Sequence, residues 1–191
     1  ARALAIQPEG IAIPQMKNML FYGPPGCGKT LLAAAVSNVT DATFFSVKVS
    51  DLLSRYYGDS PRLVQALYDE ARSHGNSIVF LDEIDALAGS RTGSDSSADR
   101  HLKNSLLNEL DGLNEKGSDH QVQTIAATNR PWELDEAILS RFEKSVYIPL
   151  PDRDSRRELL RLQLEAKGHR VNIADEIFLS RTEGLSGREI A

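Results

Sequence analysis

The 191-residue sequence predicts an α/β fold: a five-stranded parallel sheet with helices on both faces, followed by part of a smaller helical subdomain. Short apolar runs alternate with segments of helical periodicity, which is typical of a parallel sheet with crossover helices. A glycine-rich turn separates the first apolar run from the first helical segment. After Pro151 the pattern is helical only. We therefore expect a large subdomain over residues 1–151 and the start of a helical lid, cut short, over residues 152–191.

Five apolar segments are predicted to be strands, because each is short, apolar and bounded by turn residues. Proline ends the last of them at the Pro149-Leu150-Pro151 break. Since helices connect these segments, neighbouring strands are expected to run parallel. The predicted strands are Asn18 to Tyr22, Thr43 to Val47, Ser77 to Leu81, Gln121 to Ala127 and Ser145 to Ile148.

Helices are predicted where good helix formers gather or where apolar residues recur three and four positions apart. Between Gly89 and Asp99 the chain is polar and rich in glycine and serine, so we expect an exposed loop there. The predicted helices are Thr30 to Asn38, Pro61 to Ser73, the run with Leu102, Leu106, Leu107 and Leu110, Asp135 to Ser140, Arg153 to Ala166, Ala174 to Ser180, and one that begins at Ser186.

The composition is that of a globular domain, with 41% hydrophobic and 26% charged residues. A formal charge of -5 argues against non-specific nucleic-acid binding as the main task. No apolar run approaches the roughly 18 residues of a membrane-spanning helix, and no signal-peptide pattern is present. We expect a cytoplasmic protein with no direct nucleic-acid role, which meets membranes only through its clients. Cys27, the only cysteine, is expected to have a packing role.

The turn after the first strand reads Gly23-Pro24-Pro25-Gly26-Cys27-Gly28-Lys29-Thr30, the spacing of a phosphate-binding loop. Its glycines let backbone N–H groups point inward, and the following helix presents its positive end. Lys29 is expected to reach the terminal phosphates of ATP, and Thr30 to ligate Mg²⁺. The sequence thus predicts a P-loop NTPase, although a glycine-rich turn that matches by chance is the alternative. The predicted ATP contacts are Gly23, Pro25, Gly26, Cys27, Gly28, Lys29, Thr30 and Leu31.

Three polar residues follow predicted strands, at the carboxyl edge where parallel sheets bind ligands. Asp82 is expected to hold Mg²⁺, and Glu83 to act as the general base that polarises the attacking water. Asn129 follows the fourth strand, which we expect between the strand of the phosphate loop and the strand of Asp82. Its amide can then bond both the γ-phosphate and the water. A solvated acidic pair and a capping asparagine are the alternatives.

Further strings follow the phosphate loop in order: S-I-V-F-L-D-E-I-D-A-L, I-A-A-T-N-R-P-W-E-L-D-E-A-I-L-S-R-F, V-Y-I-P-L-P-D and G-L-S-G-R-E-I. From about Asn18 onward the chain resembles the AAA ATPases. F-F-S-V-K-V-S-D-L-L-S-R-Y-Y-G-D-S is similar to the branch of vacuolar-sorting ATPases that disassemble ESCRT-III filaments, their archaeal cell-division relatives, katanin, spastin and fidgetin. Pro131-Trp132-x-Leu134-Asp135-Glu136 resembles the archaeal members most.

The resemblance implies a homo-hexamer that pulls a polypeptide through its central pore. Tyr56 and Tyr57 then belong to the first pore loop, where an aromatic ring grips many sequences through contact area, unless the two tyrosines simply pack together. The stretch from Ser90 to Arg100 is a second pore loop or a plain solvated loop. ESCRT-III-like filament subunits are the leading clients. Microtubules, membrane proteins, and a nucleotide-gated scaffold with little turnover remain alternatives.

Two arginines depart from the pattern of relatives. Arg141 matches the position from which AAA ATPases send an arginine into the ATP of the neighbouring subunit, but Ser140 replaces a second arginine beside it. Gly187 and Arg188 are expected at the nucleotide, and relatives mostly have Ala or Ser after this glycine. Our hypothesis is that Arg188 partly replaces the missing charge, and a solvent-facing arginine is the alternative. Trp132 is expected to anchor its own loop by packing.

Overall fold

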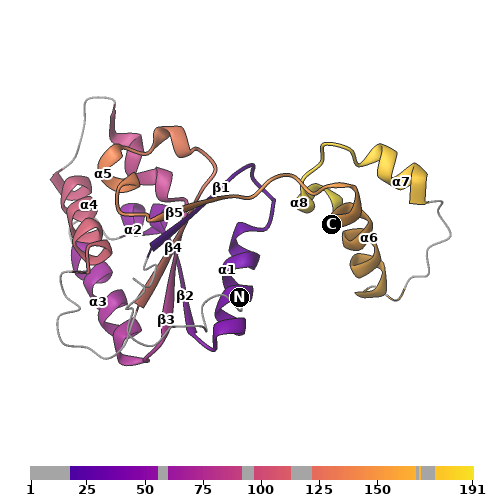
Figure 1. Cartoon of the computed structure of the whole chain (residues 1–191). Coiled ribbons are helices and arrows are strands. Elements are labelled where there is room, and N and C mark those ends of the chain that lie inside the picture. The colour runs from indigo at the N-terminus through magenta and orange to yellow at the C-terminus, as the bar shows by residue number, and fades with distance from the viewer. Residues whose placement is uncertain (1–17, 56–59, 92–96, 113–121, 167, 169–174) are drawn as a thin grey trace, which may run out of the picture.

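The computed structural model describes residues 18–55, 60–91, 97–112, 122–166, 168 and 175–191. Their strands form one parallel sheet in the order β2-β3-β4-β1-β5, which confirms the predicted α/β fold (Figure 1). The strands are β1 Asn18–Tyr22, β2 Thr43–Lys48, β3 Ser77–Asp82, β4 Val122–Thr128 and β5 Lys144–Tyr147.

Burial along each strand follows its place in the sheet. The central strands β3 and β4 are buried at nearly every position, whereas the edge strands β2 and β5 are exposed at alternate positions or more. A strand covered on both faces favours a continuous apolar run, and the run S-I-V-F-L predicted β3 in this way. Because β4 lies between β1 and β3, the residues that follow these three strands meet at one edge of the sheet.

Helices cover both faces of the sheet (Figure 1). One face packs against α1 (Lys29–Thr40) through a core that includes Phe21, Ala33 and Phe80. The other face packs against most of the remaining elements of this part, with Leu20, Leu81 and Ala126 at its centre. Those elements are α2 (Val49–Arg55), α3 (Ser60–Ser73), the 3₁₀ helix η2 (Ile84–Arg91), α4 (Ser97–Leu110) and α5 (Glu136–Leu139). The 3₁₀ helix η3 (Pro131–Glu133) follows β4 and contributes no buried residue.

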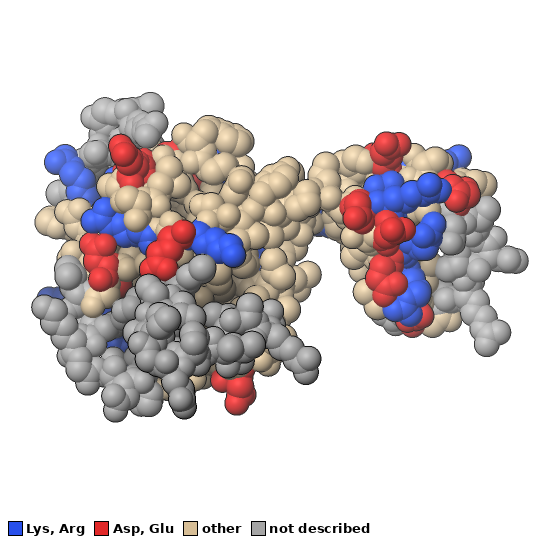
Figure 2. Space-filling view, in the orientation of Figure 1, with Lys and Arg blue, Asp and Glu red and all other residues tan. Residues whose placement is uncertain are grey.

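Beyond β5 the chain leaves the sheet and forms a lobe of three helices, called the lid helices below (Figure 1). They are α6 (Arg153–Ala166), α7 (Asp175–Arg181) and α8 (Gly187–Ile190). Lys, Arg, Asp and Glu side chains gather on the lobe face seen in Figure 2. Within α6, Arg161 pairs with Glu158 and Glu165. Exposed pairs of this kind stabilise a helix only slightly, so this face is a solvated surface. None of the described helices is both long and apolar enough to cross a membrane.

The segments between strands differ from the prediction in two places. Helix α2 was not predicted, because its seven residues are too few to show a helical period, although Val49, Leu52 and Leu53 pack against the core. The predicted loop from Gly89 to Asp99 is helical at both ends, since η2 runs to Arg91 and α4 begins at Ser97. Helix formation is cooperative, so a helix with an apolar face extends into polar residues at its start. The middle of that loop, 92–96, lies outside the described residues.

Candidate active site

The loop between β1 and α1 has the backbone shape of an anion-binding turn. Gly23, Gly26 and Gly28 have φ angles of 148°, 76° and 87°. A Cβ on Gly23 would lie 2.1 Å from the carbonyl oxygen of Ile148, and a Cβ on Gly26 would lie 2.8 Å from Ser186 Oγ. Only glycine therefore fits at these two positions, and the loop residues suit a nest of N–H groups around phosphate.

Lys29, the first residue of α1, is held against this loop. Its Nζ donates to the carbonyl oxygens of Gly23 at 2.9 Å and Pro24 at 2.8 Å, and to Asn129 Oδ1 at 2.7 Å. Only 8% of the residue is exposed. Burial lowers the pKa of Lys29, and the positive charge of Arg188 acts in the same direction. The ammonium is thus enclosed and sensitive to any negative charge that enters the loop.

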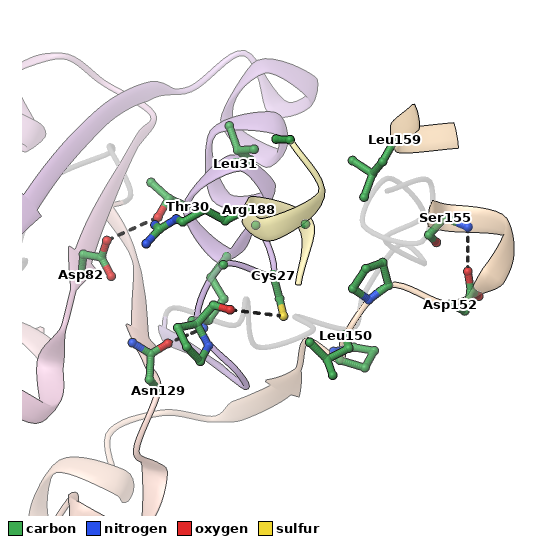
Figure 3. A pocket seen from close by; sticks show the side chains of 18 of the residues that line it. Cys27, Thr30, Leu31, Asp82, Asn129, Leu150, Asp152, Ser155, Leu159 and Arg188 are labelled. Atoms are coloured by element: carbon green, nitrogen blue, oxygen red, sulfur yellow. Dashed lines mark hydrogen bonds between the residues drawn. The ribbon is translucent and has the colours of Figure 1, made fainter. Parts of the chain in front are cut away.

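Oxygen donors for a metal lie beside the loop. Thr30 Oγ1 donates to Asp82 Oδ2 at 3.3 Å, although the two residues are 52 positions apart in the chain (Figure 3). Hydroxyl and carboxylate oxygens are the ligands that Mg²⁺ prefers, so the pair fits this ion. Among the described residues there is no cluster of three His, Cys, Asp or Glu side chains that could hold a metal. Phosphate oxygens and water would therefore have to complete the coordination.

The neighbouring carboxylate, that of Glu83, is held by residues at the end of β2. Its Oε1 accepts from Lys48 Nζ at 2.9 Å, and its Oε2 accepts from Ser50 Oγ at 3.0 Å. These two hydrogen bonds, Lys48 first, lower the pKa of the Glu83 carboxyl. Glu83 also has a φ of 55°, and its N–H donates to Asp82 Oδ1 at 2.9 Å. The lowered pKa favours the ionised carboxylate. Its two oxygens accept from Lys48 and Ser50, so the carboxylate has to give up one of these hydrogen bonds in order to bind water.

Sequence reasoning missed Lys48 and Ser50. The sheet register pairs Lys48 with Asp82, so Lys48 reaches the same edge as the acidic pair. The available clue was a polar residue at the carboxyl end of the second strand, at the edge where the other candidates were sought.

A cavity of about 720 Å³ brings the nucleotide candidates together (Figure 3). This volume is typical of small-molecule sites. Asp82, Glu83 and Asn129 line it along with the phosphate loop from Pro25 to Leu31. The opposite wall consists of lid residues and of the connection from β5, and most of this wall was not predicted. Its members are Pro149, Leu150, Pro151, Asp152, Ser155, Leu159, Gln163, Gly187, Arg188 and Ala191.

Helix α8 rests directly on the phosphate loop. The backbone N–H of Arg188 donates to the Gly26 carbonyl oxygen at 3.1 Å, and a Cβ on Gly187 would lie 3.3 Å from the same oxygen. Figure 3 shows the Arg188 side chain running from α8 toward Thr30. Arg188 therefore lines the pocket, although the residue is exposed, and its contact with a nucleotide stays a prediction.

Arg141 does not line this cavity. It lies at the end of α5, where its Nε and Nη2 donate to the two carboxylate oxygens of Asp111 at 3.0 and 3.2 Å. Its Nη1 donates to the Ala137 carbonyl oxygen at 3.1 Å and to Ser140 Oγ at 3.0 Å. Of the described nucleotide candidates, the cavity lining thus lacks Gly23, whose carbonyl oxygen accepts from Lys29, and Arg141, which was expected to act on another subunit.

The predictions for the aromatic residues concern the tyrosine pair and Trp132. Tyr56 and Tyr57 lie outside the described residues. Trp132 is not a packing anchor, because 74% of it is exposed. Its neighbour Leu134 is 4% exposed and packs in the core, so the leucine anchors this turn and leaves the indole outside.

In this parallel sheet the phosphate loop follows β1, and Asp82 lies at the end of β3, two strands away. This arrangement is typical of the P-loop nucleoside triphosphatases. The chain belongs to one family of them, since residues 19–150 match the model of the ATPase family associated with various cellular activities (AAA).

Similar proteins and solved structures indicate the group within this family to which the chain belongs. The chain is 45% identical to spastin of Anopheles gambiae over 97% of its own length and 44% identical to vacuolar protein sorting-associated protein 4A of Rattus norvegicus over 92%. It spans only 23% and 40% of the lengths of these two proteins. A crystal structure of the FIGL-1 AAA domain in complex with ADP matches 93% of this chain and 58% of its own, with 37% identity and a TM-score of 0.79. A structure titled for katanin self-assembly matches 93% of this chain and 56% of its own, with 39% identity and a TM-score of 0.77. The chain is thus an AAA ATPase of the spastin, katanin and vacuolar-sorting group.

Proposed function

We propose that this chain hydrolyses ATP in the cytoplasm as the core of a hexameric motor that pulls polypeptide clients through a central pore. The observation that carries the hydrolytic part is the convergence of Lys29, Asp82, Glu83 and Asn129 on one cavity that residues of the lid helices also line. The FIGL-1 domain, similar in fold and sequence, was solved with ADP, which supports a nucleotide as the occupant.

Each residue has a task that its position allows. Lys29 exchanges its hydrogen bonds to loop carbonyls for the terminal phosphates of the substrate. Asn129, which accepts from Lys29, is then free to orient the water. Glu83 leaves Lys48 and takes the proton of that water as its oxygen attacks the γ-phosphorus. The bond from the γ-phosphorus to the bridging oxygen breaks at the same time, and ADP leaves with that oxygen. Thr30 and Asp82 would hold Mg²⁺, which neutralises charge on the phosphates when bound.

The motor part of the proposal rests on Arg141. In the P-loop enzymes an arginine that stabilises the transition-state charge commonly arrives from another chain. Arg141 lies outside the cavity of its own chain, where it pairs with Asp111. Among the described residues that line the cavity, Arg188 is the only arginine. The similarity to a katanin known to self-assemble supports a homo-oligomer in which each Arg141 serves the next site.

Phosphate release as a function of protein concentration tests both parts. Release per chain is expected to rise steeply with concentration and then level off, because the complete site forms only on assembly. Glu83→Gln should abolish release and spare ATP binding, whereas Arg141→Ala should abolish release at every concentration. A release rate per chain independent of concentration would refute the shared site. No release at any concentration, with ATP still bound, would favour the nucleotide-gated scaffold.

The clients belong to the proposal as well. ESCRT-III-like filament subunits are the leading candidates, given the similarity to vacuolar protein sorting-associated protein 4A, and the similarity to spastin and katanin keeps microtubules as the alternative. Tyr56→Ala is expected to leave ATP hydrolysis unchanged and to abolish remodelling of either filament. Remodelling at the original rate by this variant would exclude the pore role of Tyr56.

A further inference from the structure

The backbone of Arg141 is attached to the first strand by one buried side chain. The amide Nδ2 of Asn18 donates to the Arg141 carbonyl oxygen at 2.9 Å and to the Leu110 carbonyl oxygen at 2.8 Å. Only 6% of Asn18 is exposed. Both neighbours of this amide group are acceptors, so the NH₂ end must face them. The main-chain carbonyl oxygen of Asn18 accepts from Glu143 N–H at 3.2 Å. One residue thus holds the chain on both sides of Phe142.

The guanidinium of Arg141 has a second point of attachment on the same helix end. Asp111 directly follows Leu110, the last residue of α4, and accepts from two nitrogens of the guanidinium. An arginine side chain has several rotatable bonds, and a planar bidentate pair fixes its direction as well as its position. Asn18 and Asp111 therefore grip the arginine at its two ends, the backbone and the guanidinium.

This arrangement is connected to the nucleotide site of the same chain through β1. Asn18 is the first residue of that strand, and the strand leads straight into Gly23 at the start of the phosphate loop. Pairing with β4 on one side and β5 on the other makes β1 a rigid element. A shift of the loop along the strand axis would therefore reach Asn18, and with it the carbonyl oxygen of Arg141.

We propose that Asn18 and Asp111 are positioning residues that aim Arg141 at the ATP of a second copy of this chain. Asn18 fixes the position of the Arg141 backbone, and Asp111 fixes the direction of the guanidinium. On assembly the phosphate of the neighbouring ATP replaces the Asp111 carboxylate as the partner of the guanidinium. The inference rests on the proposed function, because it assumes that Arg141 acts on another subunit.

Mixed oligomers test the proposal, because they separate the chain that supplies the arginine from the chain that hydrolyses ATP. The donor chain carries Glu83→Gln and keeps Arg141, and the acceptor chain carries Arg141→Ala and keeps Glu83. Neither should release phosphate alone, and their mixture should. Asn18→Asp keeps the shape of the side chain but loses both N–H donors, and Asp111→Asn keeps the shape but loses the charge. Either change in the donor chain should lower kcat of the mixture about tenfold with KM for MgATP unchanged, since misplaced catalytic groups cost rate.

The matched control puts the same changes in the acceptor chain, whose position 141 is already alanine. There they should leave kcat within about twofold, because no arginine remains to be aimed. Equal losses in donor and acceptor would overturn the proposal, since the residues would then act through folding or through their own site. Unchanged kcat with both donor variants would overturn it too. A mixture that releases no phosphate even without these changes would refute the shared site itself, and the inference with it. If Asn18→Asp does not fold, Asp111→Asn at the partly exposed position decides alone.

Discussion

Replacing Gly26 with alanine is expected to open the lid, because this glycine is the point where the phosphate loop touches α8. Two costs can be worked out. The residue has a φ of 76°, and an L-residue in that region costs about 1–2 kcal/mol. The new Cβ would also lie 2.8 Å from Ser186 Oγ and 2.9 Å from Arg188 Cβ, both closer than real contacts allow. Moving α8 away relieves the overlap but breaks the Arg188 N–H bond to Gly26, worth about 0.5–1.5 kcal/mol.

Two other glycines separate these costs. Gly28 and Gly184 also have positive φ angles, 87° and 77°, but a Cβ on either would have nothing within 4 Å. Gly28→Ala and Gly184→Ala should therefore lose about 1–2 kcal/mol of unfolding free energy, and Gly26→Ala about 1.5–3.5 kcal/mol. The loss of chain entropy in the unfolded state is the same for all three substitutions and cancels in the comparison.

Urea denaturation followed by circular dichroism, without nucleotide, measures these differences. ADP titration then reports the lid, and Gly26→Ala should bind ADP several-fold more weakly than Gly184→Ala does. If the three variants lose the same stability and Gly26→Ala binds ADP as tightly as Gly184→Ala, the loop and α8 do not bear on each other, and the closed arrangement of the site would be refuted.

Three further predictions concern single side chains. Lys48→Met removes the main cause of the lowered pKa of Glu83, so the acid limb of the kcat profile should move to higher pH; an unmoved limb would mean that Glu83 is not the titrating base. Arg188→Ala should weaken ATP binding about fivefold more than ADP binding, with Arg188→Lys intermediate, and equal losses for both nucleotides would exclude contact with the γ-phosphate. Trp132→Ala should leave the free energy of unfolding in urea unchanged, within about 0.5 kcal/mol, because the indole is exposed. A large loss of this free energy, followed by circular dichroism, would restore the anchoring role.

The parts of the site that sequence could predict are those carried by consecutive residues. The phosphate loop is one continuous turn whose glycines are needed by their backbone angles, so its pattern is visible in eight letters. Asp82 and Asn129 follow apolar runs, and parallel strands deliver their ends to one edge whatever the details of packing. The strand order was the remaining requirement, and β4 does lie between β1 and β3 as the Asn129 argument assumed.

The parts that could not be predicted depend on contacts between distant residues that carry no local pattern. Glu83 meets Lys48 and Ser50 across 35 and 33 positions, and Asn18 meets the carbonyl oxygen of Arg141 across 123. The sequence places Asn18 at the start of a strand but does not show which distant groups its side chain bonds.

The same distinction explains why the arginine was identified and its support was not. Family resemblance marks Arg141 by its neighbours in the chain, but the aim of its guanidinium depends on Asp111, 30 positions away, and on Asn18 at the far end of the strand that carries the phosphate loop. Ser140 contributes a hydroxyl to the same guanidinium. A residue that acts on another copy has no substrate in its own chain to hold it in place, so its orientation has to be maintained by its own fold. Because Ser140 leaves Arg141 as the arginine next to Phe142, we expect its direction to depend strongly on this support. Substitutions at Asn18 or Asp111 should then matter most in the chain that is proposed to donate the arginine.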